Sequence, residues 1–314
     1  MRNSSPTALA LACLIGLSVS TAFAADKAAT PAKAKTMQDI LDASKPSDWR
    51  SLDPENTLYL QLAGGRVVIE LAPNFAPKHS ENIRKLAREK YFDGLSINRS
   101  QDNFVVQWGD PNGGEAGEKA ITTAEKHLPA EFTHGYDKNF DFHRLPDVDG
   151  WAPQVGFSYG MPTARDPKSH QAWLTHCYGM VGAGRGNEPD SSTGNELYVV
   201  IGQSPRQLDR NITVVGRVIQ GMELLSILPR GTGPLGFYEK AEQRVPITSI
   251  TLAADVPESE REHIEIMRTD TPAFTQLIEA RRNRSDEWYK VKAGHIDVCN
   301  VPIPVRPVAA PAAK

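Results

Sequence analysis

The chain has 314 residues, of which 40% are hydrophobic and 23% charged, and its formal net charge is −3. This composition is ordinary for a globular domain, and the length suits one large domain with extensions or two small ones. Nucleic-acid binding is not indicated, because that function usually requires a clearly basic surface. Glycine and proline are frequent, at 24 and 23 residues, which favours a turn-rich β architecture over a helical bundle.

Residues 1–24 have the pattern of a secretory signal peptide. Arg2 supplies a positive charge, residues 8–19 form a short apolar run, and Ala22, Phe23 and Ala24 fit the small-x-small cleavage motif. The apolar run is too short to span a bilayer comfortably. We therefore predict cleavage after Ala24, no membrane insertion afterwards, and a periplasmic or secreted protein.

Two cysteines, Cys177 and Cys299, lie after the predicted signal. In an oxidising compartment they could pair and tether the C-terminal part of the chain to the main domain. Two separate buried thiols fit the sequence equally well, because spacing does not show proximity.

Residues 25–52 are expected to form a linker and one short helix. Residues 26–36 are an Ala/Lys/Pro run without apolar periodicity, and Met37–Ala43 carries enough apolar positions for one or two helical turns. Alternating apolar residues then predict a strand over 58–62, and a second strand follows over 66–71. The Gly-Gly pair between them is typical of a hairpin.

A helix is predicted from Pro77, since proline suits a first helical turn. The following segment, 91–111, places Arg99 and Gln107 among apolar residues on a predicted pair of strands. Such a pattern is a poor basis for hydrolysis or redox chemistry, but it suits binding a peptide and polarising one amide. Further short strands and one helical run follow, which together predict a closed β-barrel or a sandwich. These elements are expected at 179–184, 194–202, 208–218, 222–225 and 247–252.

The order of these motifs resembles the cyclophilin-type peptidyl-prolyl isomerases. The shared features are the hairpin, the Tyr-Phe-Asp-Gly that closes the helix, the arginine strand, the Phe-x-x-Gln-x-Gly-Asp strand, the Gly-rich loop, Val-Val-Gly-Arg-Val and Gly-Met-Glu. The resemblance covers residues 53–253, with one insertion at about 133–177. It implies a mainly β fold, a closed antiparallel barrel capped by two helices.

The resemblance also implies the site. Arg99, Phe104 and Gln107 match catalytic positions, with Arg99 donating to the prolyl nitrogen and Gln107 holding its guanidinium. No metal or cofactor is needed, since the reaction only requires preferential binding of the twisted amide. The implied substrate is a proline-containing polypeptide. The positions that match the proline pocket and peptide groove are Val105, Val181, Gly182, Glu196, Tyr198, Leu208 and Ile212. Without the resemblance, these apolar residues would be interpreted as core and the arginine as a solvated surface group.

The chain departs from the family pattern at several of these positions. Asn98 stands where a histidine is usual, Ile212 replaces the pocket histidine, and Gln207 precedes Leu208 where the groove tryptophan is lost. Tyr198 replaces a phenylalanine. Glu196 replaces a glutamine, and its carboxylate could pair with Arg99 and compete with substrate. These changes predict reduced or altered activity.

The insertion and the C-terminal extension are less familiar. The insertion is expected to be an ordered excursion beside the groove, and its histidines are interpreted as lying in a polar loop in preference to a metal site, because their spacing matches no ligand pair. These histidines are His134, His143, His170 and His176. For the extension, 254–314, we expect two helices. The first covers 258–268, and the second begins at a Thr271-Pro272 cap and ends at Arg282. A disordered tail is expected from Val305.

Two functions therefore remain open. One is an isomerase that acts on the Xaa-Pro bonds of exported proteins. The other is a cyclophilin-like peptide-binding or chaperone module with little or no turnover. A metal-dependent hydrolase has only the insertion histidines in its favour. The oligomeric state is not indicated by the sequence.

Overall fold

The computed structural model describes residues 35–284 and 286–308. The chain divides into two units, Met1–Ala34 and Lys35–Lys314, and the described residues belong to the second. The predicted signal peptide, residues 25–34 and the last residues of the tail (309–314) lie outside the described part. None of the helices in the described ranges has the length and apolar character needed to cross a membrane.

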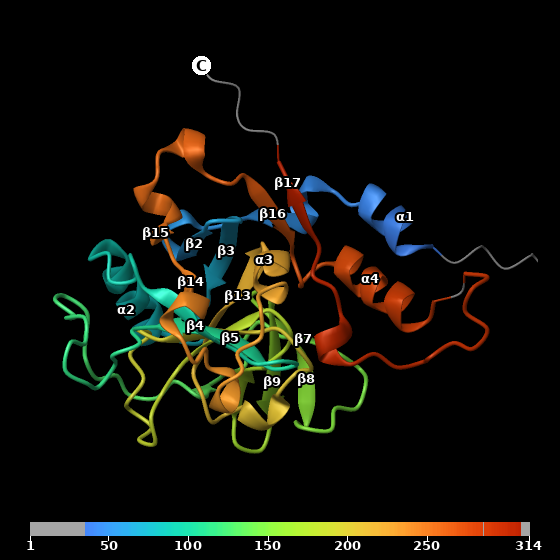
Figure 1. Cartoon of the computed structure of the whole chain (residues 1–314). Helices are drawn as coiled ribbons and strands as arrows, with labels where there is room; N and C mark the ends of the chain where they lie inside the picture. The colour runs from blue at the N-terminus through green and yellow to red at the C-terminus, as the bar shows by residue number, and fades with distance from the viewer. Residues whose placement is uncertain (1–34, 285, 309–314) are drawn as a thin grey trace, which may run out of the picture. The chain divides into compact units, whose positions relative to one another are not determined.

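A nine-stranded antiparallel sheet forms the main part of the fold (Figure 1). Its order is β14-β4-β5-β12-β11-β13-β3-β2-β15. The bounds are β2 (Thr57–Leu62), β3 (Gly65–Leu71), β4 (Ser96–Ser100), β5 (Val105–Gly109), β11 (Met180–Ala183), β12 (Leu197–Val200), β13 (Val214–Gln220), β14 (Val245–Pro246) and β15 (Ser249–Leu252).

The two end strands of this sheet are consecutive in the chain. Between them, the Ile247 amide donates to the Leu95 carbonyl and the Thr248 amide to the Gln61 carbonyl, each at 2.9 Å. The sheet is therefore so strongly curled that one segment contributes to both of its ends. The expected mainly β antiparallel fold is confirmed, as a strongly curled sheet where a closed barrel was expected. Among the described strands, however, no ladder joins β14 directly to β15, so full closure of the barrel is not seen.

Two helices accompany the curled sheet, α2 (Pro77–Arg88) and α3 (Met222–Ser226). The predicted start of α2 is confirmed, with proline in the first turn, and Ile83 and Leu86 are fully buried against the interior of the sheet. The predicted hairpin is also confirmed: Leu62 pairs with Gly65, whose φ of +144° suits glycine. Each strand places alternate residues inside this core, which fixes the other set on the outer face.

The insertion forms a second antiparallel sheet of its own, in the order β6-β10-β9-β8-β7. The sequence predicted an ordered segment here but no strands. Its core is shared with the C-terminal extension, where the rings of Phe157 and Phe274 meet edge to face at 5.1 Å. The bounds are β6 (His134–Gly135), β7 (His143–Arg144), β8 (Gln154–Ser158), β9 (Met161–Asp166) and β10 (Gln171–Leu174).

The C-terminal extension is mixed, which corrects the expectation of a helical one. A helix does begin at the Thr271 cap as α4 (Pro272–Arg282), and the short helix near the start of the described chain is α1 (Met37–Asp42). The predicted helix over 258–268 is wrong. Ile264 and Ile266 are buried on either side of a more exposed Glu265, the alternation of a strand.

That strand, β16 (Ile264–Met267), lies between β1 (Trp49–Ser51) and β17 (Val305–Pro307) in a three-stranded sheet (Figure 1). The start of the expected disordered tail is therefore paired in a sheet. Short 3₁₀ turns complete the fold at Pro46–Asp48, Pro54–Asn56, Arg206–Leu208, Pro234–Gly236, Ala241–Gln243, Ala253–Asp255, Glu258–Glu260 and Val298–Asn300.

A disulfide joins Cys177 to Cys299, which the sequence had left open. Cys177 ends the insertion and Cys299 lies in the last 3₁₀ turn of the extension. The bond therefore ties the extension to the segment that leads into β11.

Candidate active site

Arg99 and Gln107 are cross-strand partners on β4 and β5. A shift of register after Ile97 brings them opposite each other, and the Arg99 Nη1 donates to the Gln107 Oε1 at 2.8 Å. Val106 and Trp108, which flank the glutamine on β5, are fully buried in the core. Strand alternation therefore places the arginine–glutamine pair on the outer face of the curled sheet.

The guanidinium of Arg99 is held by two further groups. Its Nε donates to the Leu235 carbonyl at 2.7 Å, and its Nη2 donates to the Gln101 side chain. The rings of Phe104 and Phe237 lie 5.5 and 5.3 Å from the guanidinium carbon. Among the described residues, these bonds use three of the five N–H donors of an arginine, which leaves two for a ligand.

Glu196 does not pair directly with Arg99 in the way the sequence suggested. It accepts a 2.6 Å hydrogen bond from Gln107 Nε2, so that Gln107 stands between the cation and the carboxylate. Burial lowers the pKa of Arg99, and the nearby Glu196 charge opposes that change. An arginine has so high an intrinsic pKa that its guanidinium stays charged.

An apolar cluster separate from the core lies beside this polar chain. It contains Phe104, Val105, Tyr198, Val200 and Ile212. Three of the predicted pocket residues, Val105, Tyr198 and Ile212, are therefore brought together with Phe104 at the outer face of β5 and β12. Phe104 and Ile212 are only half-buried, so the cluster has an accessible apolar edge.

The sequence profile described as cyclophilin type peptidyl-prolyl cis-trans isomerase/CLD matches residues 57–252, more than half of the chain. This chain belongs to that family. A probable peptidyl-prolyl cis-trans isomerase of Brucella suis biovar 1 is 28% identical over 180 residues, covering 57% of this chain and 74% of that protein. Peptidyl-prolyl cis-trans isomerase-like 1 of Homo sapiens is 26% identical over 216 residues, covering 68% of this chain and 98% of that protein.

A solved cyclophilin, AquaCyp293 from Hirschia baltica, has a TM-score of 0.68 to this structure at 26% identity. The match covers 87% of this chain and 97% of that one, more of this chain than the family profile spans. The family and the enzyme class expected from the motifs, peptidyl-prolyl cis-trans isomerase, are thus confirmed by homology. The roles of individual residues stay predictions.

Three of the expected groove positions need comment. Val181 is fully buried in the core of this cyclophilin, because it points inward from β11, so its side chain does not line a groove. Gly182 points outward beneath Tyr198, its register partner on β12. Leu208 is half-buried in the 3₁₀ turn Arg206–Leu208 and is not a member of the apolar cluster around Tyr198.

The interpretation of the insertion histidines as polar-loop residues is wrong for His134 and His143, which lie on strands β6 and β7, and most clearly for His176. Its side chain is buried, and its Nε2 lies 2.8 Å from the Tyr198 hydroxyl. The sequence carried one signal for this contact, since a tyrosine at a buried pocket position usually requires a hydrogen-bond partner. Gln101, Leu235 and Phe237 were also missed, because their contacts with Arg99 depend on how loops fold. No group of three or more metal-ligating side chains occurs within 35–284 and 286–308.

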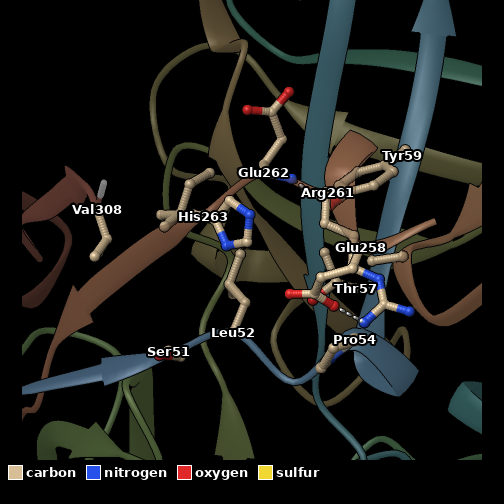
Figure 2. A pocket seen from close by; sticks show the side chains of 12 residues that line it. Ser51, Leu52, Pro54, Thr57, Tyr59, Glu258, Arg261, Glu262, His263 and Val308 are labelled. Atoms are coloured by element: carbon tan, nitrogen blue, oxygen red, sulfur yellow. Dashed lines mark hydrogen bonds and ion pairs between the residues drawn. The ribbon is translucent and has the colours of Figure 1, made fainter. Parts of the chain in front are cut away.

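Two cavities bear on the location of the site. One of about 540 Å³ adjoins Glu196 and is lined mainly by polar residues, including Asn98, Asp110, Arg185 and Arg244. Another of about 310 Å³ lies between β2 and the C-terminal extension, remote in sequence from the arginine strand (Figure 2). None of the predicted site residues lines the second cavity, and its Arg261 is paired with Glu258 at 2.6 Å.

Proposed function

We propose that this chain is an active isomerase that accelerates rotation about Xaa-Pro bonds through Arg99. One observation carries the proposal. The guanidinium is fixed by Gln107 and its other partners, retains two donors, and adjoins an apolar cluster that includes Phe104. A proline ring seated on that cluster would bring its amide toward the free donors.

The chemistry requires no bond to be made to the protein. Rotation about a peptide bond has a barrier of about 18–20 kcal/mol because the C–N bond has partial double-bond character. A hydrogen bond to the prolyl nitrogen localises its lone pair and reduces that character. Each 1.36 kcal/mol removed from the barrier accelerates the exchange about tenfold. Arg99 suits this role because its charge is permanent and its donors are fixed in direction.

We further infer that the substrates are exported proteins. Two observations support this inference: the signal-peptide pattern of residues 1–24, and the disulfide between Cys177 and Cys299. Disulfides persist mainly in oxidising compartments such as the bacterial periplasm.

A peptide-binding module with little turnover is the second candidate. It is favoured by the occupancy of Arg99, whose Nε is bonded to the Leu235 carbonyl and whose guanidinium lies beside Phe237. If this loop kept the donors away from the prolyl nitrogen, peptides would bind without faster rotation.

Exchange spectroscopy on a panel of Xaa-Pro peptides distinguishes the two. We expect the parent protein to accelerate cis/trans exchange, and Arg99→Ala to lose at least about 90% of that acceleration. Arg88→Ala is the matched control, because Arg88 is an exposed arginine on α2 that pairs with Glu55 and Asp255. A folded parent that binds the peptides without accelerating exchange would establish the binding module instead.

A further inference from the structure

A chain of buried polar groups runs beneath the candidate proline pocket. The Tyr198 hydroxyl meets His176 Nε2 at 2.8 Å, and His176 Nδ1 meets Asp209 Oδ1 at 2.9 Å. Arg206 Nε donates to Asp209 Oδ2 at 2.6 Å. The two Nη groups of Arg206 then bind both oxygens of Asp149, at 2.9 and 3.2 Å. Nothing in the reaction proposed above uses these groups.

Every member of this chain is buried. His176 is 1% exposed, Arg206 3% and Asp209 7%, while the side chain of Asp149 is 3% exposed. Burial of charged groups is unfavourable unless they are paired and hydrogen-bonded. Here each charge has a partner, so the chain is a satisfied network and not an isolated contact.

The protonation states indicate which group donates and which accepts each hydrogen bond of the network. Burial alone would raise the pKa of Asp209, but the hydrogen bond from His176 and the charge of Arg206 outweigh it and lower that pKa. An ionised Asp209 only accepts hydrogen bonds, so Nδ1 of His176 carries a proton, and in the network inferred here Nε2 is the acceptor. Burial raises the pKa of Tyr198, so its hydroxyl keeps its proton and donates a hydrogen bond to Nε2.

The tyrosine ring has a defined resting place over β11. A Cβ atom added to Gly182 would lie 2.2 Å from the Tyr198 hydroxyl oxygen, so only glycine leaves room for the ring there. The imidazole of His176 is nearly parallel to that ring, with an interplanar angle of 10° and centroids 6.3 Å apart. The hydrogen bond at the far end of the ring therefore sets how the ring lies in the apolar cluster.

We propose that His176 is a positioning residue for the isomerase site, and that it holds Tyr198 as the floor of the proline pocket. The proposal rests on the function proposed above. Asp209 fixes the imidazole, and Arg206 connects Asp209 to Asp149. His176 and Asp149 both belong to the insertion, so the insertion is a structural part of the substrate pocket. Arg206 and Asp209 also bracket Leu208, so the same network anchors the turn that carries it.

A double-mutant cycle tests this coupling. The variants are Tyr198→Phe, His176→Leu and the two together, and the readouts are the dissociation constant of an Ala-Pro peptide and its exchange rate. We expect each single change to weaken peptide binding about three- to tenfold, the range for loss of one neutral hydrogen bond. The double variant should then be scarcely weaker than His176→Leu alone. Effects that multiply would overturn the proposal, since His176 would then act independently of Tyr198.

His143→Leu is the matched control. His143 is a half-buried histidine on β7 of the same insertion. Its ring contacts Phe274, which is not one of the predicted pocket residues. This variant should keep peptide affinity within about twofold of the parent. A loss as large as that of His176→Leu would mean that any disturbance of the insertion weakens binding, which contradicts a specific role for His176.

A second measurement on the unmodified protein keeps the test independent of folding of the variants. The ¹⁵N shifts of His176 should show a protonated Nδ1 and an unprotonated Nε2 near neutral pH. The opposite tautomer would refute the network as drawn. A parent that binds Ala-Pro without accelerating exchange would disprove turnover, yet the cycle in binding affinity would still decide the positioning role. A parent that binds no proline peptide would overturn both proposals.

Discussion

Removal of the Cys177–Cys299 disulfide should destabilise the fold by about 4–5 kcal/mol. The two cysteines are 122 residues apart in the sequence, and the loop that the bond closes is correspondingly long. In the chain-entropy description, a cross-link of about this span removes roughly 5 kcal/mol of conformational entropy from the unfolded chain. Cys177 is also buried, so its neighbours lose packing when the bond is replaced.

The assay is urea unfolding of the oxidised protein, of the reduced protein and of Cys177→Ser/Cys299→Ser, each followed by circular dichroism. The reduced parent and the double variant should unfold at similar, lower urea concentrations, and reductant should not affect the variant further. A loss of less than about 1 kcal/mol would refute the reasoning, because the unfolded chain would then gain little freedom from opening the loop.

Gln107→Leu should lower kcat/KM for Xaa-Pro exchange at least tenfold with the protein still folded, because Arg99 loses the acceptor that orients it; unchanged exchange kinetics would contradict this. Gly182→Ala should lower both peptide affinity and unfolding free energy, the latter by about 1–3 kcal/mol, since the added carbon would overlap Tyr198. Gly150→Ala, where the space is open, serves as control. Asp209 has a lowered pKa in the folded state, so its stabilising effect is present above its unfolded pKa of about 3.9 and lost as pH falls further. Asp209→Asn should therefore show a shallower loss of stability below pH 4 than the parent; equal slopes would exclude Asp209 as a source of acid sensitivity.

The curled sheet and its central pair of site residues were predictable because their signals are local. The hairpin of β2 and β3 follows from alternation around a Gly-Gly pair. The strands that carry Arg99 and Gln107 are separated by a short turn, which leaves little choice of partner. The register shift after Ile97, which brings the two side chains opposite each other, is not fixed by the short turn.

The supporting contacts could not be predicted, because they depend on distant loops. Leu235 and Phe237 contact Arg99 from a distant segment of the chain. The Leu235 carbonyl that accepts from Arg99 is 136 residues away in the sequence. His176 approaches Tyr198 through the fold of an insertion whose strands have only two to six residues. Such short strands give too few alternations to recognise. The β16 error has a related origin, since charged residues around Ile264 and Ile266 obscured the alternation.

The region matched by the family profile is joined to the C-terminal extension by shared packing and a disulfide. Tyr198 depends on His176 of the insertion for its hydrogen bond, and His176 directly precedes Cys177, which is bonded to the C-terminal extension. The core of the insertion is completed by Phe274 of α4. A fragment that ended at residue 253 would expose this shared apolar surface and lack the anchor next to His176. If the proposed proline pocket is correct, the extension supports it through the insertion, without contributing any of the residues assigned to that pocket.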